Sequence, residues 1–377
     1  MPVRATKRGP ERTPLDRDCD VLICGASFAG LAVARELAGC GAEVLMVDRY
    51  EIGERQTSAC GIPTEWLFAL GLEGALQQTF GELVVHTPFA TTRFDLPWTF
   101  STFDYRTLCE LLAAQGEFVF ETAKVEGWGG PGAVRTDRGE IRSPLIVDAL
   151  GWRRVLGAGT NVQPPDALLS RGLEVHPFGR GSDLEVWIDR SYVPAGYGWS
   201  FPAGEEIRIG VGSFDPRFHV REPTERLASD LDAERIHYQG NWIPHALRPA
   251  TEDGVFFAGD SAGHCLPLTA EGIRTALYYG LACGRELRAV LAGDQDRSQA
   301  LASYHRFSAS HGWKFAWLLG AQRLVPRLPP RLLSGSLRTM QRKRFVDWSF
   351  GHYLEIAHPR FAASTVPSGA RPTALAA

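Results

Sequence analysis

The chain has 377 residues, a formal net charge of −3 and an apolar fraction of 44%, which is ordinary for a soluble protein. This length allows two domains with full-sized hydrophobic cores, and the near-neutral charge argues against a nucleic-acid-binding protein. Because no run of about 18 or more apolar residues occurs, we expect no transmembrane helix.

The basic, polar segment 1–17 lacks the apolar core of a secretory signal, and we expect it to be a loose tail. The seven cysteines are an odd number and lack the spacing of metal ligands. They therefore predict free thiols in a cytoplasmic protein and no metal site.

A strand–turn–helix–strand pattern follows this tail. Residues 20–24 are apolar and predict a buried strand, the turn 25–30 contains glycines, and residues 31–38 predict a helix. A second apolar strand, 43–47, follows. This order is typical of a nucleotide-binding unit, in which the turn places a pyrophosphate at the N-terminus of the helix.

Particular residues of this unit are predicted to hold the cofactor. Gly25 and Gly30 occupy the outer positions of G-x-G-x-x-G, and Ser27 replaces the middle glycine with another small residue. Asp48 ends the second strand, about 20 residues after the turn, where a ribose hydroxyl needs an acceptor. Arg49 follows it and is assigned to the same site.

The middle of the chain is rich in strand-like runs, such as 184–188 and 207–211. Tyr197 and Trp199 alternate on one predicted strand and therefore share a face. Two interpretations are open for this pair. The rings pack in a core, or they form an apolar wall for a hydrophobic substrate beside a flavin, which we favour.

The segment 255–273 predicts a flavin site. An apolar strand runs into Gly259 and Asp260, whose carboxylate can accept hydrogen bonds from a polyol. A loop containing Pro267 follows, and a new helix is expected to begin near Glu271 and Gly272, with Gly272 and Ile273 assigned to the cofactor site. The N–H groups of that helix would favour the anionic, reduced ring. The alternative is an ordinary strand–loop–helix connection with Asp260 as a cap.

His264 lies within the same loop. It could donate a proton near the ring, and the simpler expectation is a solvated loop histidine.

Residues 301–362 predict helices broken by prolines, and the segment after them is rich in alanine, serine and proline and predicts disorder. A basic run alternates with leucines here, and we favour a solvated helix face. The functional alternative is contact with a membrane surface, an acidic carrier or an electron donor. The run consists of Arg323, Arg327, Arg331, Arg338, Arg342, Lys343 and Arg344.

These patterns predict an α/β fold in which a Rossmann-type FAD-binding domain is interrupted by an antiparallel-sheet substrate domain and followed by a helical C-terminal region. The expected boundaries are 18–60, 103–157 and 250–300 for the cofactor domain, 61–102 and 158–249 for the substrate domain, 301–362 for the helices, and 1–17 and 363–377 for the tails.

Together the motifs resemble the FAD-dependent oxidoreductases related to p-hydroxybenzoate hydroxylase, and within that group the geranylgeranyl reductase family. The segment 259–273 is similar to the flavin motif of that family, with Ala270 in place of a glycine. Residues 194–202 are similar to its substrate motif, P-x-x-Y-x-W-x-F-P. The resemblance covers about residues 18–300.

The resemblance implies further site residues. Cys60 falls where such reductases have a cysteine near the flavin, and Arg106 and Val125 match positions that touch the FAD phosphate and adenine. Ala203 stands where a lysine is common, which argues against a prenyl-diphosphate substrate. The predicted catalytic residues are Cys60, Tyr197, Trp199 and His264.

We therefore expect an FAD-dependent oxidoreductase that moves a hydride between flavin N5 and a hydrophobic small molecule, by double-bond reduction or dehydrogenation. An FAD-dependent monooxygenase of a biosynthetic pathway is the alternative, and a flavin-binding protein without enzymatic activity is the third reading. A flavin-dependent halogenase ranks last. In its W-x-W-x-I pattern the outer tryptophan and the isoleucine are replaced here by Tyr197 and Phe201.

The source of electrons is predicted less directly. Only one Rossmann-type fingerprint is present, so NADPH, NADH or a reduced electron carrier would visit transiently. The expected partners are a hydrophobic substrate, with an electron-donor protein or acidic carrier as a further candidate, and contact with a membrane that is at most peripheral.

Overall fold

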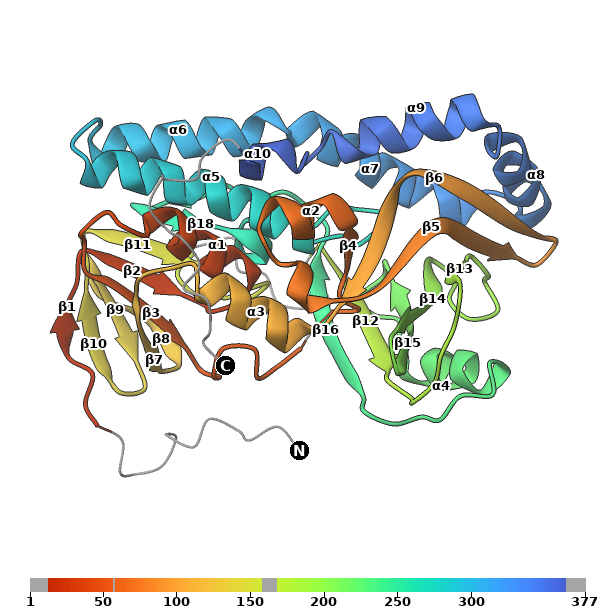
Figure 1. The fold of residues 1–377 in the computed structure, drawn as a ribbon, viewed down its shortest axis with the longest axis horizontal. Coiled ribbons are helices and arrows are strands. Elements are labelled where there is room, and N and C mark those ends of the chain that lie inside the picture. Colours follow the sequence, from red (N-terminus) through yellow and green to blue (C-terminus); the bar gives the residue numbers. More distant parts are fainter. Residues whose placement is uncertain (1–12, 57, 158–167, 364–377) are drawn as a thin grey trace, which may run out of the picture.

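A six-stranded sheet forms the centre of the half that the sequence predicts to bind the cofactor. The computed structural model describes residues 13–56, 58–157 and 168–363 (Figure 1). All neighbours in the sheet are parallel except β17 and β18, which are antiparallel. In spatial order the strands are β17 (Thr251–Glu252), β18 (Val255–Phe257), β11 (Leu145–Asp148), β2 (Val21–Cys24), β3 (Val44–Asp48) and β7 (Val119–Thr122).

Helices cover one face of this sheet. α1 (Phe28–Leu37) follows β2, as the sequence predicts, and lies between α3 (Tyr105–Ala113) and α5 (Ile273–Leu291). Two glycines let α1 and α5 approach closely. A Cβ atom at Gly280 would lie 2.6 Å from the carbonyl oxygen of Ala29, and one at Gly284 would lie 2.6 Å from Cβ of Glu36.

A second, four-stranded sheet covers the other face. Its order is β1 (Arg17–Asp18), β10 (Gly139–Arg142), β9 (Ala133–Thr136) and β8 (Val125–Gly130). Val134 and Ile141 from this sheet share a buried core with Leu22 and Leu45 of the parallel sheet. The cofactor-binding half therefore has three layers.

The predicted tail 1–17 is wrong at its C-terminal end. Leu15 is buried, its N–H donates to the carbonyl of Arg138, and Arg17 pairs with Ile141. The free edge of β10 explains this difference, because an unpaired strand edge offers hydrogen bonds to any extended segment nearby. Residues 1–12 and the predicted tail from residue 364 lie outside the described residues.

An eight-stranded sheet forms the other half. All described strands from the two segments predicted to be the substrate domain belong to it, and we propose that it is this domain. Its neighbours are antiparallel except β13 and β5, which are parallel because they come from different inserted segments. In order they are β16 (Gln239–Pro244), β12 (Leu169–Val175), β15 (Glu206–Ser213), β14 (Gly196–Ala203), β13 (Leu184–Trp187), β5 (Leu76–Thr87), β6 (Ala90–Phe103) and β4 (Gly61–Pro63).

Short helices complete this half. α4 covers β12 and β15 through a small apolar cluster that includes Leu227 and Val211. α2 lies next to β4 and β6, and a single 3-10 turn leads into β5. The bounds are α2 (Thr64–Ala69), η1 (Glu73–Ala75) and α4 (Arg221–Asp230).

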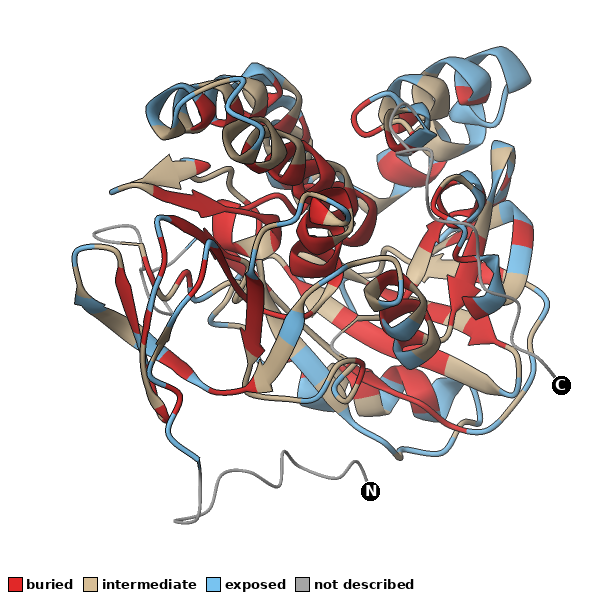
Figure 2. Cartoon of the chain, turned by 60° about the vertical axis from the view of Figure 1, so that its left-hand side comes forward, coloured by how far each residue is buried: buried red, intermediate tan, exposed pale blue. Residues whose placement is uncertain are grey.

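The C-terminal helices run across both halves (Figure 1). α6 pairs with α5, whereas α9 packs on β6 through Val346 and Phe94. In Figure 2 the burial of α5 contrasts with the exposed outer faces of these helices. Their bounds are η2 (Gly259–Ala262), α6 (Arg297–Ser310), α7 (Gly312–Leu324), η3 (Val325–Arg327), α8 (Pro330–Met340), α9 (Lys343–Leu354) and α10 (Arg360–Ala363). Within the described ranges, no helix combines the length and apolarity needed to cross a bilayer.

The close contact of α1 and α5 gives a matched stability test. Gly280→Ala should destabilise the protein by about 1–3 kcal/mol, because the new methyl group overlaps the backbone of α1. Gly320→Ala on α7 should instead stabilise it by roughly 0.5–1 kcal/mol, since nothing lies within 4 Å of that Cβ position. Thermal unfolding of both variants should shift the midpoints in opposite directions. Equal shifts would contradict the packing described here.

Candidate functional site

The turn between β2 and α1 requires glycine at its first and third motif positions. Gly25 has φ +110°, and a Cβ atom there would lie 2.3 Å from the carbonyl oxygen of Ala149. A Cβ atom at Gly30 would lie 1.9 Å from the carbonyl oxygen of Gly25. Ser27 precedes α1 without capping it, and its Oγ lies 3.1 Å from the hydroxyl of Tyr105. The first N–H groups of α1 thus have no side-chain cap, which suits an anion.

Asp48 lies at the end of β3, where the sequence places it. Its carboxylate accepts hydrogen bonds from the N–H of Ala26 at 2.9 Å and of Tyr50 at 3.0 Å. Burial raises the pKa of Asp48, and these two bonds oppose the rise. Asp48 therefore ties the glycine turn to the strand end and keeps lone pairs for a ribose. The guanidinium of Arg49 lies 4.8 Å from the centre of the Tyr50 ring.

A cationic group lies near the same end of the sheet. Arg106, on the first turn of α3, is exposed, and its guanidinium makes no hydrogen bond within the described ranges. The loop after β3 passes so close that a Cβ atom at Gly53 would lie 2.9 Å from Cα of Arg106. Val125 is buried at the start of β8. A free guanidinium beside a glycine turn suits a diphosphate.

The carboxylate of Asp260 is well placed to bind a polar ligand. It follows β18 and accepts no hydrogen bond from the described part of the chain. Although the side chain keeps some solvent contact, burial raises the pKa of Asp260 to about 6, opposed by the charge of Arg248. Gly259 beside it has φ +63°, and its Cβ position lies 3.0 Å from Ala29 on α1. The carboxylate therefore has acceptor capacity to spare, and the hydroxyls of a ribityl chain would suit it.

The loop between η2 and α5 is fixed at several points. The N–H of Leu268 donates to Oε1 of Gln322 on α7 at 2.7 Å, and the carboxylate of Glu271 accepts from the hydroxyl of Tyr353 on α9. Arg274, which is completely buried, donates to Glu271 at 2.6 Å. The sequence shows Glu271 and Arg274 three residues apart, but nothing in it points to Gln322 or Tyr353.

The backbone of this loop shows why the related flavin motif has a glycine where this chain has Ala270. Ala270 has φ +52° and Leu268 has φ +69°, both in the left-handed region where glycine has no steric penalty. Pro267 is buried, and Gly272 precedes α5, which begins at Ile273 and not at residue 271. A Cβ atom at Gly272 would lie 3.2 Å from Sγ of Cys265. The N-terminus of α5 therefore lies beside Cys265 and Asp260.

Tyr197 and Trp199 share a face of β14, as predicted, with ring centroids 6.0 Å apart. The hydroxyl of Tyr197 donates to the carbonyl of Thr269 at 2.6 Å, which joins the eight-stranded sheet to the loop before α5. The indole of Trp199 donates to Glu174 at 3.1 Å and packs so closely on β15 that a Cβ atom at Gly210 would lie 2.3 Å from it. Both rings stay half-buried, with one face packed on the sheet.

Cys60 is completely buried and has φ +52°. Its thiol lies 3.2 Å from the carbonyl of Ser58, and burial raises its pKa well above the usual range. The thiol therefore keeps its proton at neutral pH and is no thiolate nucleophile. Its carbonyl accepts from the N–H of Phe103, whose ring contacts Phe28 at the start of α1. This contact places Cys60 near the glycine turn.

The expectation of a solvated His264 is wrong. The imidazole is completely buried, stacks on Tyr279 with centroids 3.7 Å apart, and lies 3.0 Å from Oγ of Ser308 on α6. Burial lowers its pKa well below the usual value, so the ring is neutral. The loop turns back under η2, which places His264 between α5 and α6. We therefore no longer propose it as a proton donor.

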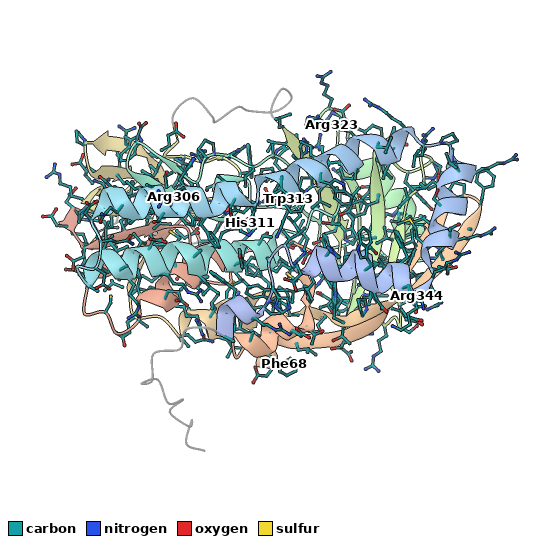
Figure 3. The ribbon with its side chains drawn as sticks, turned by 90° about the horizontal axis from the view of Figure 1, so that it is seen from above. Phe68, Arg306, His311, Trp313, Arg323 and Arg344 are labelled. Atoms are coloured by element: carbon teal, nitrogen blue, oxygen red, sulfur yellow. The ribbon has the colours of Figure 1, made fainter. Side chains whose placement is uncertain are left out.

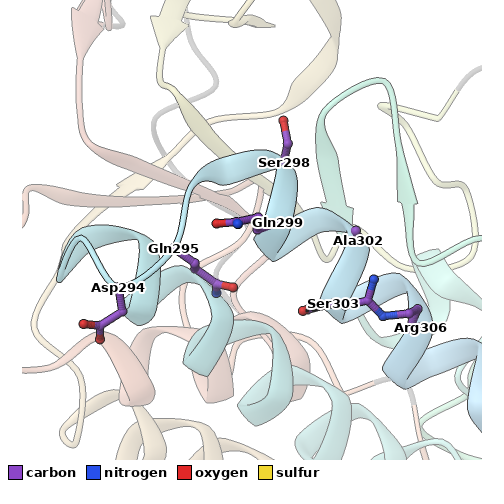
Figure 4. Close-up of a pocket in the computed structure, with 7 residues that line it drawn as sticks. All are labelled: Asp294, Gln295, Ser298, Gln299, Ala302, Ser303 and Arg306. Atoms are coloured by element: carbon purple, nitrogen blue, oxygen red, sulfur yellow. Dashed lines mark hydrogen bonds between the residues drawn. The ribbon is translucent and has the colours of Figure 1, made fainter.

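In the described part of the chain, neither a metal site nor the surface depression near α6 contributes to the candidate site. Within the described ranges, no cluster of histidine, cysteine or acidic side chains could hold a metal ion. An open polar depression lies where α5 meets α6 (Figure 4), and the length of α5 separates it from Asp260 by roughly 28 Å. The depression is lined by Asp294, Gln295, Ser298, Gln299, Ala302, Ser303 and Arg306.

Comparisons with known proteins agree with a flavin site in this fold. A family model described as an FAD binding domain matches residues 18–84. Digeranylgeranylglycerophospholipid reductase 3 of Methanosphaera stadtmanae is 25% identical over 79% of this chain and 85% of its own length. Digeranylgeranylglycerophospholipid reductase 2 of Methanopyrus kandleri is 23% identical over 86% of this chain and 91% of its own.

Solved structures share the fold. A geranylgeranyl bacteriochlorophyll reductase-like protein of Thermoplasma acidophilum superposes with a TM-score of 0.80, covering 92% of this chain and 98% of that protein at 17% identity. The p-nitrophenol 4-monooxygenase PnpA of Pseudomonas putida covers 91% of this chain and 99% of its own at 12% identity, with a TM-score of 0.73. These findings confirm the predicted α/β fold and FAD as the cofactor.

Asp260 should make FAD binding depend on pH. Its pKa of about 6 belongs to the protein without ligand, and hydroxyl donors from FAD would lower it. Binding therefore favours the ionised carboxylate. FAD affinity should fall by up to about tenfold per pH unit below pH 6 and level off above pH 7.

The matched variants are Asp260→Asn and Asp294→Asn. The first should lose this pH dependence, whereas the second, in the depression at the start of α6, should keep the wild-type profile. Flavin fluorescence quenching measures the dissociation constants. Identical profiles for wild type and Asp260→Asn would exclude the proposed contact.

Proposed function

We propose that this chain, an FAD-dependent oxidoreductase that resembles the geranylgeranyl reductases, reduces carbon–carbon double bonds of a hydrophobic, isoprenoid-type substrate. The observation that carries the proposal is the hydrogen bond between Tyr197 and Thr269, which brings the aromatic face of β14 against the loop of the flavin site. The curated relatives matched over most of the chain are named as reductases of digeranylgeranylglycerophospholipid, which supports a lipid-like substrate.

We propose that different residues of the chain bind the cofactor and hold the proton that such a reaction needs. Bound FAD supplies hydride transfer at N5. Asp260, Asp48, Arg106 and the N-termini of α1 and α5 hold the cofactor. Reduction of a double bond places a hydride on one carbon and a proton on the other. Burial raises the pKa of both Cys60 and Tyr197, so these two groups stay protonated, and we propose that they hold a proton beside the substrate.

The substrate pocket is proposed to be apolar. Trp199 and Tyr197 offer half-buried ring faces and no charge. Ala203, where the family often has a lysine, is completely buried at the end of β14, so a cation would have no solvent there. A neutral prenyl chain therefore fits better than a prenyl diphosphate.

The reductant is proposed to visit and leave. The described residues contain one nucleotide-binding unit, β2–α1–β3, which we assign to FAD because the FAD binding domain model matches this segment. NADPH, NADH or a reduced electron carrier would then deliver electrons transiently. All seven cysteines are described and free, which fits the predicted cytoplasmic location.

Single-turnover chemistry tests the function. The holoprotein is reduced anaerobically and mixed with a glycerolipid that carries geranylgeranyl chains. We expect flavin reoxidation and a product mass increase of two hydrogens per turnover. If reoxidation occurs only with oxygen and the product gains an oxygen atom, the protein is a monooxygenase and the proposal fails.

The Trp199→Ala variant distinguishes an indole that contacts the substrate from one that only packs in the core. It should lower the unfolding temperature, because the indole covers the glycines of β15, and it should also weaken substrate binding by about tenfold or more. Trp242→Ala on β16 is the matched control, since that indole packs on Trp152 instead. It should lower the unfolding temperature and leave the substrate-induced flavin spectral shift unchanged. An equal loss of affinity in both variants would count against the pocket.

A further inference from the structure

Helices α7 and α9 expose large aromatic side chains to solvent. Trp313 is 70% exposed, Trp317 is 68% exposed and Trp348 is 58% exposed. Leu324 and Leu332 are also more than half exposed. Single exposed apolar residues are ordinary, but three exposed tryptophans on α7 and α9 are unusual and suggest an interaction surface.

These side chains lie on the outer faces of their helices. In α7 the spacing of Trp313, Trp317 and Leu324 places them on one face, opposite the buried Phe315 and Leu318. In α9 the ring of Trp348 lies 5.9 Å from that of Phe345, whereas Val346 packs on the sheet. Figure 3 views the molecule from the side on which α7, α8 and α9 lie, with Trp313, Arg323 and Arg344 labelled.

The same helices are strongly basic. Between residues 312 and 354 the only acidic residue is Asp347, which pairs with Lys343 at 2.9 Å, while the whole chain has a net charge of −3. Arg323, Arg342 and Arg344 are exposed. The cations of this segment are Lys314, Arg323, Arg327, Arg331, Arg338, Arg342, Lys343 and Arg344.

We propose that α7, α8 and α9 form a docking face for the surface of an anionic phospholipid membrane. Tryptophan side chains settle at the boundary between headgroups and acyl chains, and arginine and lysine side chains bind lipid phosphates. An acidic protein would satisfy the cations but would leave three solvated indoles without a reason. The combination of exposed indoles and cations on α7, α8 and α9 therefore favours lipid over the solvated helix face expected from the sequence.

Helices α7 and α9 of the docking face are hydrogen-bonded to residues 268 and 271 of the loop before α5. Gln322 on α7 holds the N–H of Leu268, and Tyr353 on α9 holds Glu271. We propose that a lipid substrate would enter from the membrane on this side, because the loop held by α7 and α9 also receives the hydrogen bond from Tyr197 of β14. This route rests on the proposed function, whereas membrane docking itself does not.

Vesicle sedimentation of the FAD-loaded protein tests the docking. The protein should sediment with vesicles that contain phosphatidylglycerol, remain in solution with vesicles of phosphatidylcholine alone, and be released by high salt. Trp313→Ser with Trp317→Ser should lower the partition coefficient by about tenfold. Arg323→Glu with Arg342→Glu and Arg344→Glu should lower it by about 100-fold or more.

Matched variants elsewhere on the surface control for general effects. Phe178→Ser removes a side chain that is 77% exposed near β12, and Arg135→Glu reverses an exposed charge on β9. Both should bind vesicles as the wild type does, and flavin absorbance checks that every variant is folded and loaded.

Three results would overturn the proposal: no vesicle binding by the wild type, equal binding to neutral and anionic vesicles, or full binding by the tryptophan variant. Binding to polyglutamate without binding to vesicles would assign the face to an acidic protein instead. Turnover of a detergent-solubilised substrate, measured without vesicles, tests the reductase proposal separately.

Discussion

The hydrogen bonds that fix residues 266–272 are the constraint on which the rest of the structure depends. Tyr197 reaches this loop from the eight-stranded sheet, Gln322 from α7 and Tyr353 from α9. The loop itself holds Leu268 and Ala270 in left-handed conformations, which cost of order 1–3 kcal/mol each and persist only where surrounding contacts over-determine them. The cofactor site, the substrate sheet and the C-terminal helices therefore meet at one rigid segment.

The two acidic residues of the candidate site differ in the number of hydrogen bonds that the protein itself donates to their carboxylates. Asp48 already accepts two backbone N–H groups and so stabilises the glycine turn without a cofactor. Asp260 accepts no hydrogen bond from the described residues, and its pKa is raised to about 6. If FAD binds as proposed, the site for its adenosine end is preformed, while the carboxylate proposed to lie near the flavin ring would gain hydroxyl donors from the cofactor.

Much of the cofactor half was predictable because its signals are local. The apolar runs at β2 and β3, the glycines of the turn and Asp48 are contiguous in sequence, and the fold they predicted is confirmed. The alternation that placed Tyr197 and Trp199 on one face also needs only a few residues. The roles of Cys60, Arg106 and the domain boundaries stay predictions, supported by the geometry.

The remaining features depend on contacts between distant segments. The pairing of Arg17 with Ile141 uses an edge that no local pattern shows, and the parallel contact of β13 with β5 joins two separate inserts. His264 was expected to be solvated because it follows a glycine in a predicted loop, yet its ring stacks on Tyr279 of α5 and lies 3.0 Å from Oγ of Ser308, more than forty residues later in the chain. Gln322 and Tyr353 lie in helices far along the chain from the flavin motif, so no local pattern links them to the loop.

Hydrogen–deuterium exchange of the protein with and without FAD tests the central claim, that one loop connects the cofactor to both the substrate sheet and the C-terminal helices. FAD should protect the amides of residues 25–30 and 260–275 together, and the protection should extend to β14 around Tyr197 and to the segments of α7 and α9 around Gln322 and Tyr353. Protection confined to residues 25–30, with the loop and its three anchors unchanged, would contradict the account.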